Sequence, residues 1–326
     1  MSGAGTDSGL IVERGICWDP YICSSKKGMV CVGATLALFI SDAAVIEIGE
    51  SLLIHERIFP FLCALERLLG SMVEVVGRRP LLTYSYKGRS VCEVDFLENA
   101  AGLAHHGRAG FACGPAFLKE SLESCFSSHP YIHHVFGYES FRNHLFPEVF
   151  TPPFKYACLE GPECWGWLNQ GLVNIVGCLL LQTEEPGGWG FSYYGKSAAA
   201  FRAGMEAHLL IYSLLRLSGK VEWGDAFLHE RLPWAQDQSL DNLYSGMISM
   251  LYRDFGGVQF LKGFLSQAPG LLRERSPSTV HDFTAAAENF YLACSIAARS
   301  DLYLLFTGLG FPIQNAQCLV GALLEQ

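Results

Sequence analysis

Short apolar runs separated by turn signals characterise the first hundred residues. The most apolar run, Met29 to Ile40, ends at Ser41-Asp42. It predicts one buried strand, because a membrane span needs about 20 residues. Apolar residues near helical spacing predict a helix from Ser51 to Leu69, whereas Leu81 to Tyr86 alternates and predicts a short strand before a Lys87-Gly88 turn. The N-terminal part is therefore expected to be mixed α/β.

Helical periodicity dominates after Phe96. The predicted helices are Pro115 to Cys125, Tyr131 to Leu145, Trp167 to Leu181, Ser197 to Leu217, Leu240 to Phe255, Val258 to Gln267 and Thr284 to Arg299. Pro269-Gly270 is expected to follow the end of one helix, since glycine tolerates the left-handed conformation of a cap. The prediction is an α+β fold with a mixed α/β portion over residues 1–95 and a helix-rich portion over residues 96–326.

Composition and charge narrow the choice of partners. The chain has 326 residues, of which 50% are hydrophobic and 17% are charged, so it has enough apolar material for a large core. Its net charge is -9, and its Lys and Arg residues are scattered, which argues against nucleic acid and membrane partners. Residues 1–9 lack the features of a secretory signal, so a cytoplasmic protein is expected.

Cysteine spacing gives no sign of a metal or redox site. None of the 12 cysteines forms a C-x-x-C pair, so neither a zinc ribbon nor a thioredoxin site is predicted. Free buried thiols are expected, because Cys packs as a small hydrophobe. Cys17 with Cys23, and Cys158 with Cys164, are the local pairs to examine for disulfides.

One predicted helix carries a glutamate in a pentad that can be compared with a zinc-binding pattern. The segment Tyr131 to Leu145 contains the pentad Tyr138-Glu139-Ser-Phe-Arg142, and Asn143 follows it. In an H-E-x-x-H helix, two histidines one turn apart bind zinc, and the intervening Glu activates the bound water. Here the Glu is kept, and Tyr and Arg stand in place of the histidines. Glu139 is thus the candidate catalytic carboxylate.

The pentad and Asn143 resemble the H-E-x-G-H-N motif of the enhancin and mucin-degrading branch of the gluzincin metallopeptidases. Bacterial relatives of that branch carry a Tyr-Glu-x-x-Arg-Asn version. Further similar segments, in the same order, are Gly107 to Leu118, Leu243 to Phe264, Glu288-Asn289-Phe290, Ser300-Asp301-Leu302 and Gly310-Phe311-Pro312-Ile313. The resemblance implies a zincin-like fold with a degenerate zinc motif.

The resemblance also implies how the site has changed. A gluzincin has a third zinc ligand, a Glu on the next helix, within the segment that matches Trp167 to Asn174. No Glu is present there, and Gly171 stands about in its place. The guanidinium of Arg142 is permanently charged, so it repels a cation and can pair with Glu139. We expect no metal, no cofactor and no zinc peptidase activity. The remodelled site would consist of Tyr138, Glu139, Arg142 and Asn143.

The expected function is non-catalytic binding of a peptide or glycoprotein in this remodelled cleft. Trp165, Trp167 and Trp189 are candidate ligand-binding residues, because aromatic rings offer large apolar faces for stacking. Two alternatives stay open. Gly190 to Ser197 satisfies the G-x-x-x-x-G-K-[ST] pattern of a phosphate-binding loop, and a hydrolase with altered, metal-independent chemistry is the other. No Gly-x-Ser-x-Gly elbow is present to support the latter.

Overall fold

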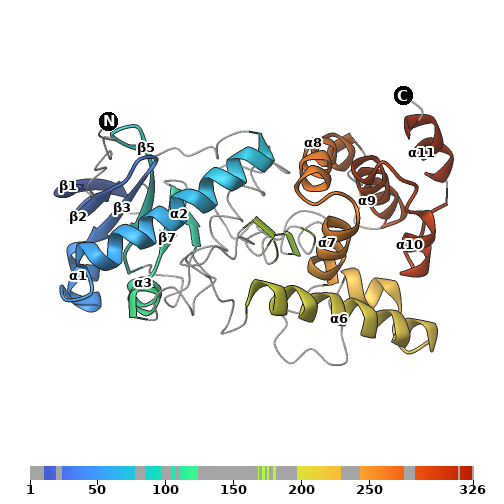
Figure 1. Cartoon of the computed structure of the whole chain (residues 1–326), viewed down its shortest axis with the longest axis horizontal. Coiled ribbons are helices and arrows are strands. Elements are labelled where there is room, and N and C mark those ends of the chain that lie inside the picture. Colours follow the sequence, from blue (N-terminus) through green and yellow to red (C-terminus); the bar gives the residue numbers. More distant parts are fainter. Residues whose placement is uncertain are drawn as a thin grey trace, which may run out of the picture. The chain divides into compact units, whose positions relative to one another are not determined.

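The fold is α+β, with a mixed sheet followed by helices (Figure 1). The computed structural model describes residues 11–19, 24–77, 85–96, 105–107, 110–123, 168, 171–172, 175, 179–180, 197–228, 243–274, 283–314 and 316–324. Its contacts divide the chain into two compact units. The first comprises residues 1–71, 81–139 and 183–197, and the second comprises residues 72–80, 140–182 and 198–326.

A seven-stranded sheet organises the first unit. Its strands are β1 (Ile11–Asp19), β2 (Ser24–Val32), β3 (Leu36–Ser41), β4 (Ser85–Tyr86), β5 (Arg89–Val94), β6 (His105–Gly107) and β7 (Gly110–Cys113). The order is β1-β2-β3-β5-β7-β6, and β4 pairs with β5 outside this path. β3, β5 and β7 run parallel, whereas the other pairs are antiparallel. The sheet therefore continues beyond residue 95 to Cys113.

The prediction of one strand from Met29 to Ile40 is wrong. The run forms two antiparallel strands, β2 and β3, and the turn between them is closed by the Gly33 N–H, which donates to the Leu36 carbonyl at 2.9 Å. Val32 and Leu36, on either side of the turn, are both buried, and Thr35 is the one polar residue of the run. The predicted Lys87-Gly88 turn is confirmed, with φ of 49° and 78° at the two positions. These values suit a tight hairpin turn between β4 and β5.

Among the described residues, the N-terminal half of the chain contains the helices α1 (Asp42–Ile48), α2 (His55–Val76) and α3 (Pro115–Glu123). Ser41 caps α1, because its Oγ accepts the Ala44 N–H at 3.2 Å. α2 buries an apolar face at helical spacing, formed by Ile58, Phe61, Leu62, Leu65 and Leu69. It is fixed to the sheet by Glu66, whose Oε1 accepts the N–H groups of Thr35 and Leu36 at 2.6 and 2.9 Å.

Helices dominate the second unit. They are α6 (Ala198–Leu217), the π-helix η3 (Gly224–Leu228), α7 (Leu243–Asp254), α8 (Val258–Glu274), α9 (Phe283–Ala298), α10 (Tyr303–Gly308) and α11 (Gln317–Leu324). The predicted end of a helix before Pro269 is wrong, since α8 continues through Pro269 and Gly270 to Glu274. The described positions between 168 and 180 are helical, as expected. No helix among the described residues is long and apolar enough to cross a membrane.

Aromatic rings and close helix packing form the core of the second unit. Phe290 on α9 lies in contact with Tyr244 of α7 and Phe264 of α8. α6 and α7 approach closely at Gly246, where an added Cβ would lie 2.4 Å from the Met205 carbonyl oxygen. Glycine at this position therefore allows backbone contact between the two helices.

Candidate functional site

Most residues of the expected site lie outside the described part of the chain. These are Tyr138, Glu139, Arg142, Asn143, Trp165, Trp167, Trp189, Gly190 to Lys196, Cys23, Cys158 and Cys164. Ser197, the last residue of the phosphate-loop pattern, is described. It is exposed and directly precedes α6. The expected pairing of Glu139 with Arg142 stays a prediction.

Gly171, which stands where a third zinc ligand was considered, belongs to a buried helical segment. Its carbonyl accepts a hydrogen bond from Ser245 Oγ of α7 at 3.0 Å. A second side chain of α7, Tyr252, donates to the carbonyl of Leu179 at 3.2 Å. These two bonds attach the segment to α7, and Gly171 offers no side-chain donor to a metal.

Two carboxylates in the C-terminal segments that resemble the gluzincins accept hydrogen bonds from backbone groups of neighbouring turns and helix starts. Glu288 Oε1 accepts the backbone N–H groups of Gln314 and Ala316 at 2.8 and 3.3 Å. Asp301 Oδ1 accepts the Tyr291 hydroxyl at 2.5 Å and the Tyr303 N–H at 2.8 Å. Both carboxylates thus have structural roles in the second unit.

A buried ionic cluster lies at the carboxyl ends of β3 and β5, and we call it the Lys26 cluster: Lys26, Ser41, Glu93 and Asp95. Residues two apart on a strand share a face, so Glu93 and Asp95 project from the sheet on the same side. The register places Gly28 opposite Ser41, and Ile40 opposite Val94, which brings Lys26 of β2 to this end of the sheet. Glu93 and Asp95 are each 6% exposed.

Each carboxylate of the Lys26 cluster has partners within the protein. The Lys26 ammonium pairs with Asp95 Oδ2 and lies 3.4 Å from Glu93 Oε1. Asp95 Oδ1 also accepts the Ser41 hydroxyl at 2.5 Å and the Phe96 N–H at 2.8 Å. The ammonium thus lies between the two carboxylates and offsets their charge.

No group of three or more His, Cys, Asp or Glu side chains in the described residues could hold a metal ion. We therefore interpret the Lys26 cluster as an ionic link between β2, β3 and β5. Sequence reasoning missed it. The available signal was the Glu93-Val-Asp95 alternation inside an apolar strand, which marks two acidic residues on one buried face.

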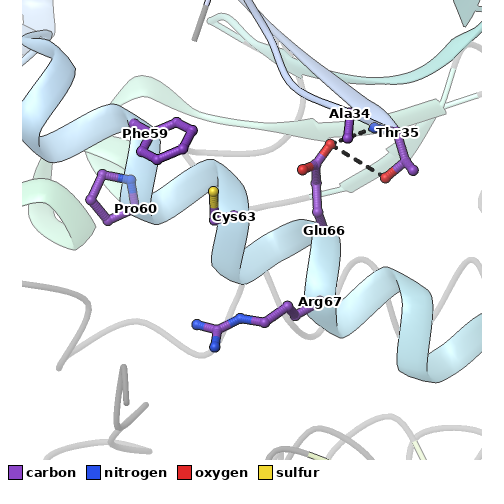
Figure 2. A pocket seen from close by; sticks show the side chains of 7 residues that line it. All are labelled: Ala34, Thr35, Phe59, Pro60, Cys63, Glu66 and Arg67. Atoms are coloured by element: carbon purple, nitrogen blue, oxygen red, sulfur yellow. Dashed lines mark hydrogen bonds between the residues drawn. The ribbon is translucent and has the colours of Figure 1, made fainter. Parts of the chain in front are cut away.

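An open hollow of about 600 Å³ lies between the β2–β3 turn and α2 (Figure 2). It is lined by Ala34, Thr35, Phe59, Pro60, Cys63, Glu66 and Arg67. Figure 2 shows Glu66 pointing to the turn, whereas Arg67 points away from it. Glu66 is already engaged by backbone N–H groups, so the hollow offers one apolar wall and one guanidinium rather than a set of convergent polar groups.

The thiol in this hollow is not an activated nucleophile. Burial raises the pKa of Cys63, and the neighbouring Glu66 carboxylate raises it further. A reactive cysteine requires the opposite shift, because the thiolate is the nucleophile. The hollow therefore gives no support to cysteine catalysis.

Alkylation with iodoacetamide at pH 8 should label Cys63 before it labels Cys31, Cys92 and Cys294. Cys63 is partly exposed and the other three are buried. Burial also raises the pKa of Cys31 to about 12 and that of Cys294 well above its ordinary value. Peptide mass spectrometry after brief labelling measures the order, with denatured protein as the control. Equal labelling of Cys31 and Cys63 in the folded protein would contradict the described packing.

Comparisons with known proteins show a fold but no family. No family model matches the chain, and no curated protein matches it significantly. A solved structure described as "a functionally unknown conserved protein mutant from Bacillus anthracis str. Ames" matches with a TM-score of 0.54 at 12% identity. The match covers 90% of this chain and 51% of the other, so this chain spans about half the length of that protein. The chain is thus similar to the Bacillus anthracis protein in fold alone.

Proposed function

We propose that this chain is a zincin-like, metallopeptidase-like protein that binds an extended peptide or glycoprotein segment without zinc catalysis. The observation that carries the proposal is β6, a short antiparallel strand at the end of the strand order. β7 is its one strand partner among the described residues. A sheet edge that has no further strand can take up an extended peptide as a new strand through main-chain hydrogen bonds.

The order of elements along the chain is the one that the gluzincin resemblance leads us to expect. β7 lies in the segment Gly107 to Leu118, which resembles the Gly-rich turn before the gluzincin motif; β6 ends at the first residue of this segment, and α3 follows β7 directly. The pentad that contains Glu139 and Arg142 comes next in the sequence. From the sequence, Glu139 and Arg142 are the proposed polar residues of the ligand site, and Trp165, Trp167 and Trp189 are the candidate stacking surfaces for side chains or sugars.

The absence of zinc catalysis follows from the donor set. Tyr138 and Arg142 replace both histidines, and Gly171 has no donor atom in its side chain. Zinc sites in proteins are built from Cys, His and carboxylate ligands, and Arg offers only hydrogen-bond donors with a permanent positive charge. Glu139 alone would not hold the ion.

Two proline variants in β6, tested separately, examine the binding proposal. Along an antiparallel edge strand, the backbone N–H groups of consecutive residues point alternately to the partner strand and away from it. Proline removes the N–H, so one of His105→Pro and His106→Pro should break a bond to β7 and lower thermal stability. The other should keep the fold and lose binding. Unfolded casein and desialylated mucin serve as peptide and glycoprotein probes in biolayer interferometry.

Zinc analysis of the purified protein is run on the same samples. We expect zinc well below one ion per chain and no peptide hydrolysis. Stoichiometric zinc that disappears in Glu139→Gln would contradict the proposed loss of the metal site. Undiminished binding of both probes by both proline variants would instead exclude the β6 edge.

A further inference from the structure

β1 lies at the opposite end of the strand order from β6, and β2 is the strand that pairs with it in the described part of the chain (Figure 1). It is nine residues long and contains no proline, whereas short length and proline are common ways of protecting a sheet edge. Its residues Ile11, Val12 and Ile16 are 57%, 51% and 60% exposed. β1 is therefore a long edge strand with exposed apolar side chains.

Hydrogen bonds elsewhere in the sheet show which way the main-chain groups of each strand point. The Ser90 N–H donates to the Thr35 carbonyl at 3.1 Å, so the odd-numbered residues along β3 bond to β5 and the even-numbered residues bond to β2. The bond from the Gly33 N–H to the Leu36 carbonyl, at 2.9 Å, agrees with this alternation. Because even-numbered residues of β3 stand opposite odd-numbered residues of β2, the even-numbered residues of β2 bond to β1.

The same alternation continues into β1. Even-numbered residues of β2 stand opposite odd-numbered residues of β1, which therefore bond to β2. The N–H and C=O groups of Val12, Arg14 and Ile16 then point to the open edge, and the side chains of these three residues share one face of the sheet. An antiparallel strand added to β1 would exchange pairs of hydrogen bonds with these residues, and its side chains opposite them would lie on the same face.

A pocket of about 300 Å³ adjoins β1 on this face. The face is the one that α1 covers, since Arg14 pairs with Asp42, the first residue of α1. The apolar lining of the pocket consists of Val12, Met29, Val45 and Leu53, and its charged lining consists of Glu13, Arg14 and Glu50. A volume of this size lies at the lower end of the range for ligand pockets, so the pocket suits one side chain of a larger ligand.

Two of the three charged residues in the lining are neutralised within the protein. Arg14 pairs with Asp42, and Glu13 accepts a hydrogen bond from the Lys87 ammonium at 2.7 Å. Glu50, in the turn after α1, has no ion-pair partner among the residues that the structure describes. The pocket thus combines apolar walls with one carboxylate whose charge is not offset.

We propose that the β1 edge binds an extended peptide as an additional antiparallel strand, and that the pocket takes a lysine side chain of this peptide. Lysine fits the lining because its four-carbon stem can lie on apolar side chains while its ammonium pairs with Glu50. β1 of a second copy does not supply this group, since its one cationic residue, Arg14, already pairs with Asp42. The inference goes beyond the proposed function and does not depend on the β6 edge.

Fluorescence anisotropy with the full chain tests the proposal. The probe is a fluorescein-labelled peptide as long as β1, with alternating threonine and valine and one central lysine. Matched peptides carry norleucine, which keeps the stem without the ammonium, or glutamate in place of the lysine. The lysine peptide should bind saturably, and the norleucine peptide should bind about two- to fivefold more weakly, the range for an exposed ion pair. The glutamate peptide should bind more weakly than both.

Variants of the protein separate the main-chain contribution from that of the pocket. Val12→Pro removes an outward N–H and no bond to β2, so it should keep the fold and weaken binding about tenfold. Val12→Thr keeps the N–H and is its control, and Ile16→Pro tests the same edge at a second position. Glu50→Lys should reverse the preference, so that the glutamate peptide binds better than the lysine peptide. Glu47→Lys, on α1, exposed and outside the pocket lining, is the matched charge control.

Four outcomes would overturn the proposal. The first is a lysine peptide that shows no saturable binding to the wild-type chain. The second is binding that both Val12→Pro and Ile16→Pro leave unchanged while circular dichroism shows that they are folded, which would place the site elsewhere. The third is equal affinity for the lysine and norleucine peptides, which would exclude Glu50. The fourth is a wild-type dimer in sedimentation velocity that Val12→Pro abolishes, which would make a second copy the occupant of the edge.

Discussion

Replacing Phe290 with alanine should lower the free energy of unfolding of the second unit by about 3 to 5 kcal/mol, the usual range for a buried Phe→Ala change. Phe290 is 1% exposed. Its ring centroid lies 5.5 Å from those of Tyr244 and Phe306, and 6.0 Å from those of Phe264 and Phe311. These four rings come from different elements, so the cavity left by alanine cannot close by moving one helix alone.

Guanidinium denaturation followed by circular dichroism measures the effect. Leu304→Ala is the matched control, because Leu304 is 84% exposed on the neighbouring α10 and its loss should change stability by no more than about 0.5 kcal/mol. The loss of stability in Phe290→Leu should lie between those of Leu304→Ala and Phe290→Ala. If Phe290→Ala lowers the free energy of unfolding by less than about 1 kcal/mol, the aromatic contacts around α9 do not contribute the expected stability to the second unit.

Replacing Lys26 with methionine should lower the free energy of unfolding by about 3 kcal/mol, because it removes the ammonium that pairs with the two buried carboxylates of the Lys26 cluster. The side chains of Glu93 and Asp95 are 8% and 9% exposed, and that of Lys26 is 18% exposed. The partial exposure of Lys26 places the expected cost at the lower end of the range for broken buried pairs.

Lys27→Met is the matched control for this variant. Lys27 is the next residue of β2, faces the other side of the sheet and is exposed, so its loss should be nearly neutral. The double variant Lys26→Met/Asp95→Asn should be less destabilised than the two single costs predict when added, since the asparagine no longer needs a cation. Equal denaturation midpoints for the Lys26 and Lys27 variants would exclude an energetic role for the cluster.

The helices of the second unit could be predicted from sequence because their signals are local. α6 was expected over Ser197 to Leu217 and spans Ala198–Leu217, since its buried residues recur at helical spacing. α8 was expected to end before Pro269. It continues because packing against α9 outweighs a local helix breaker, and at Gly263 an added Cβ would lie 3.3 Å from the Cα of Ala297.

The sheet and its ionic cluster could not be predicted in the same way. Lys26, Ser41 and Asp95 meet only because β2 pairs with β3 and β3 pairs with β5, and no local pattern encodes that register. Likewise, only Gly33 and Thr35 mark the turn between Val32 and Leu36 within an otherwise apolar run. For the remodelled site, Tyr138 to Asn143, the sequence remains the only basis of the proposal.

The parallel pairing of β3 with β5 also bears on how the protein is made. Leu36 lies opposite Ser90, so this pair joins residues that are 54 positions apart, from 90 minus 36. Contacts at such separation form late, because a long loop must close before they stabilise the chain. The buried residues of β3, Leu36 and Leu38 among them, therefore lack their parallel partner strand until β5 has been synthesised. Before that, α2, which is synthesised between β3 and β5, or a chaperone can shield the β2–β3 hairpin from other chains.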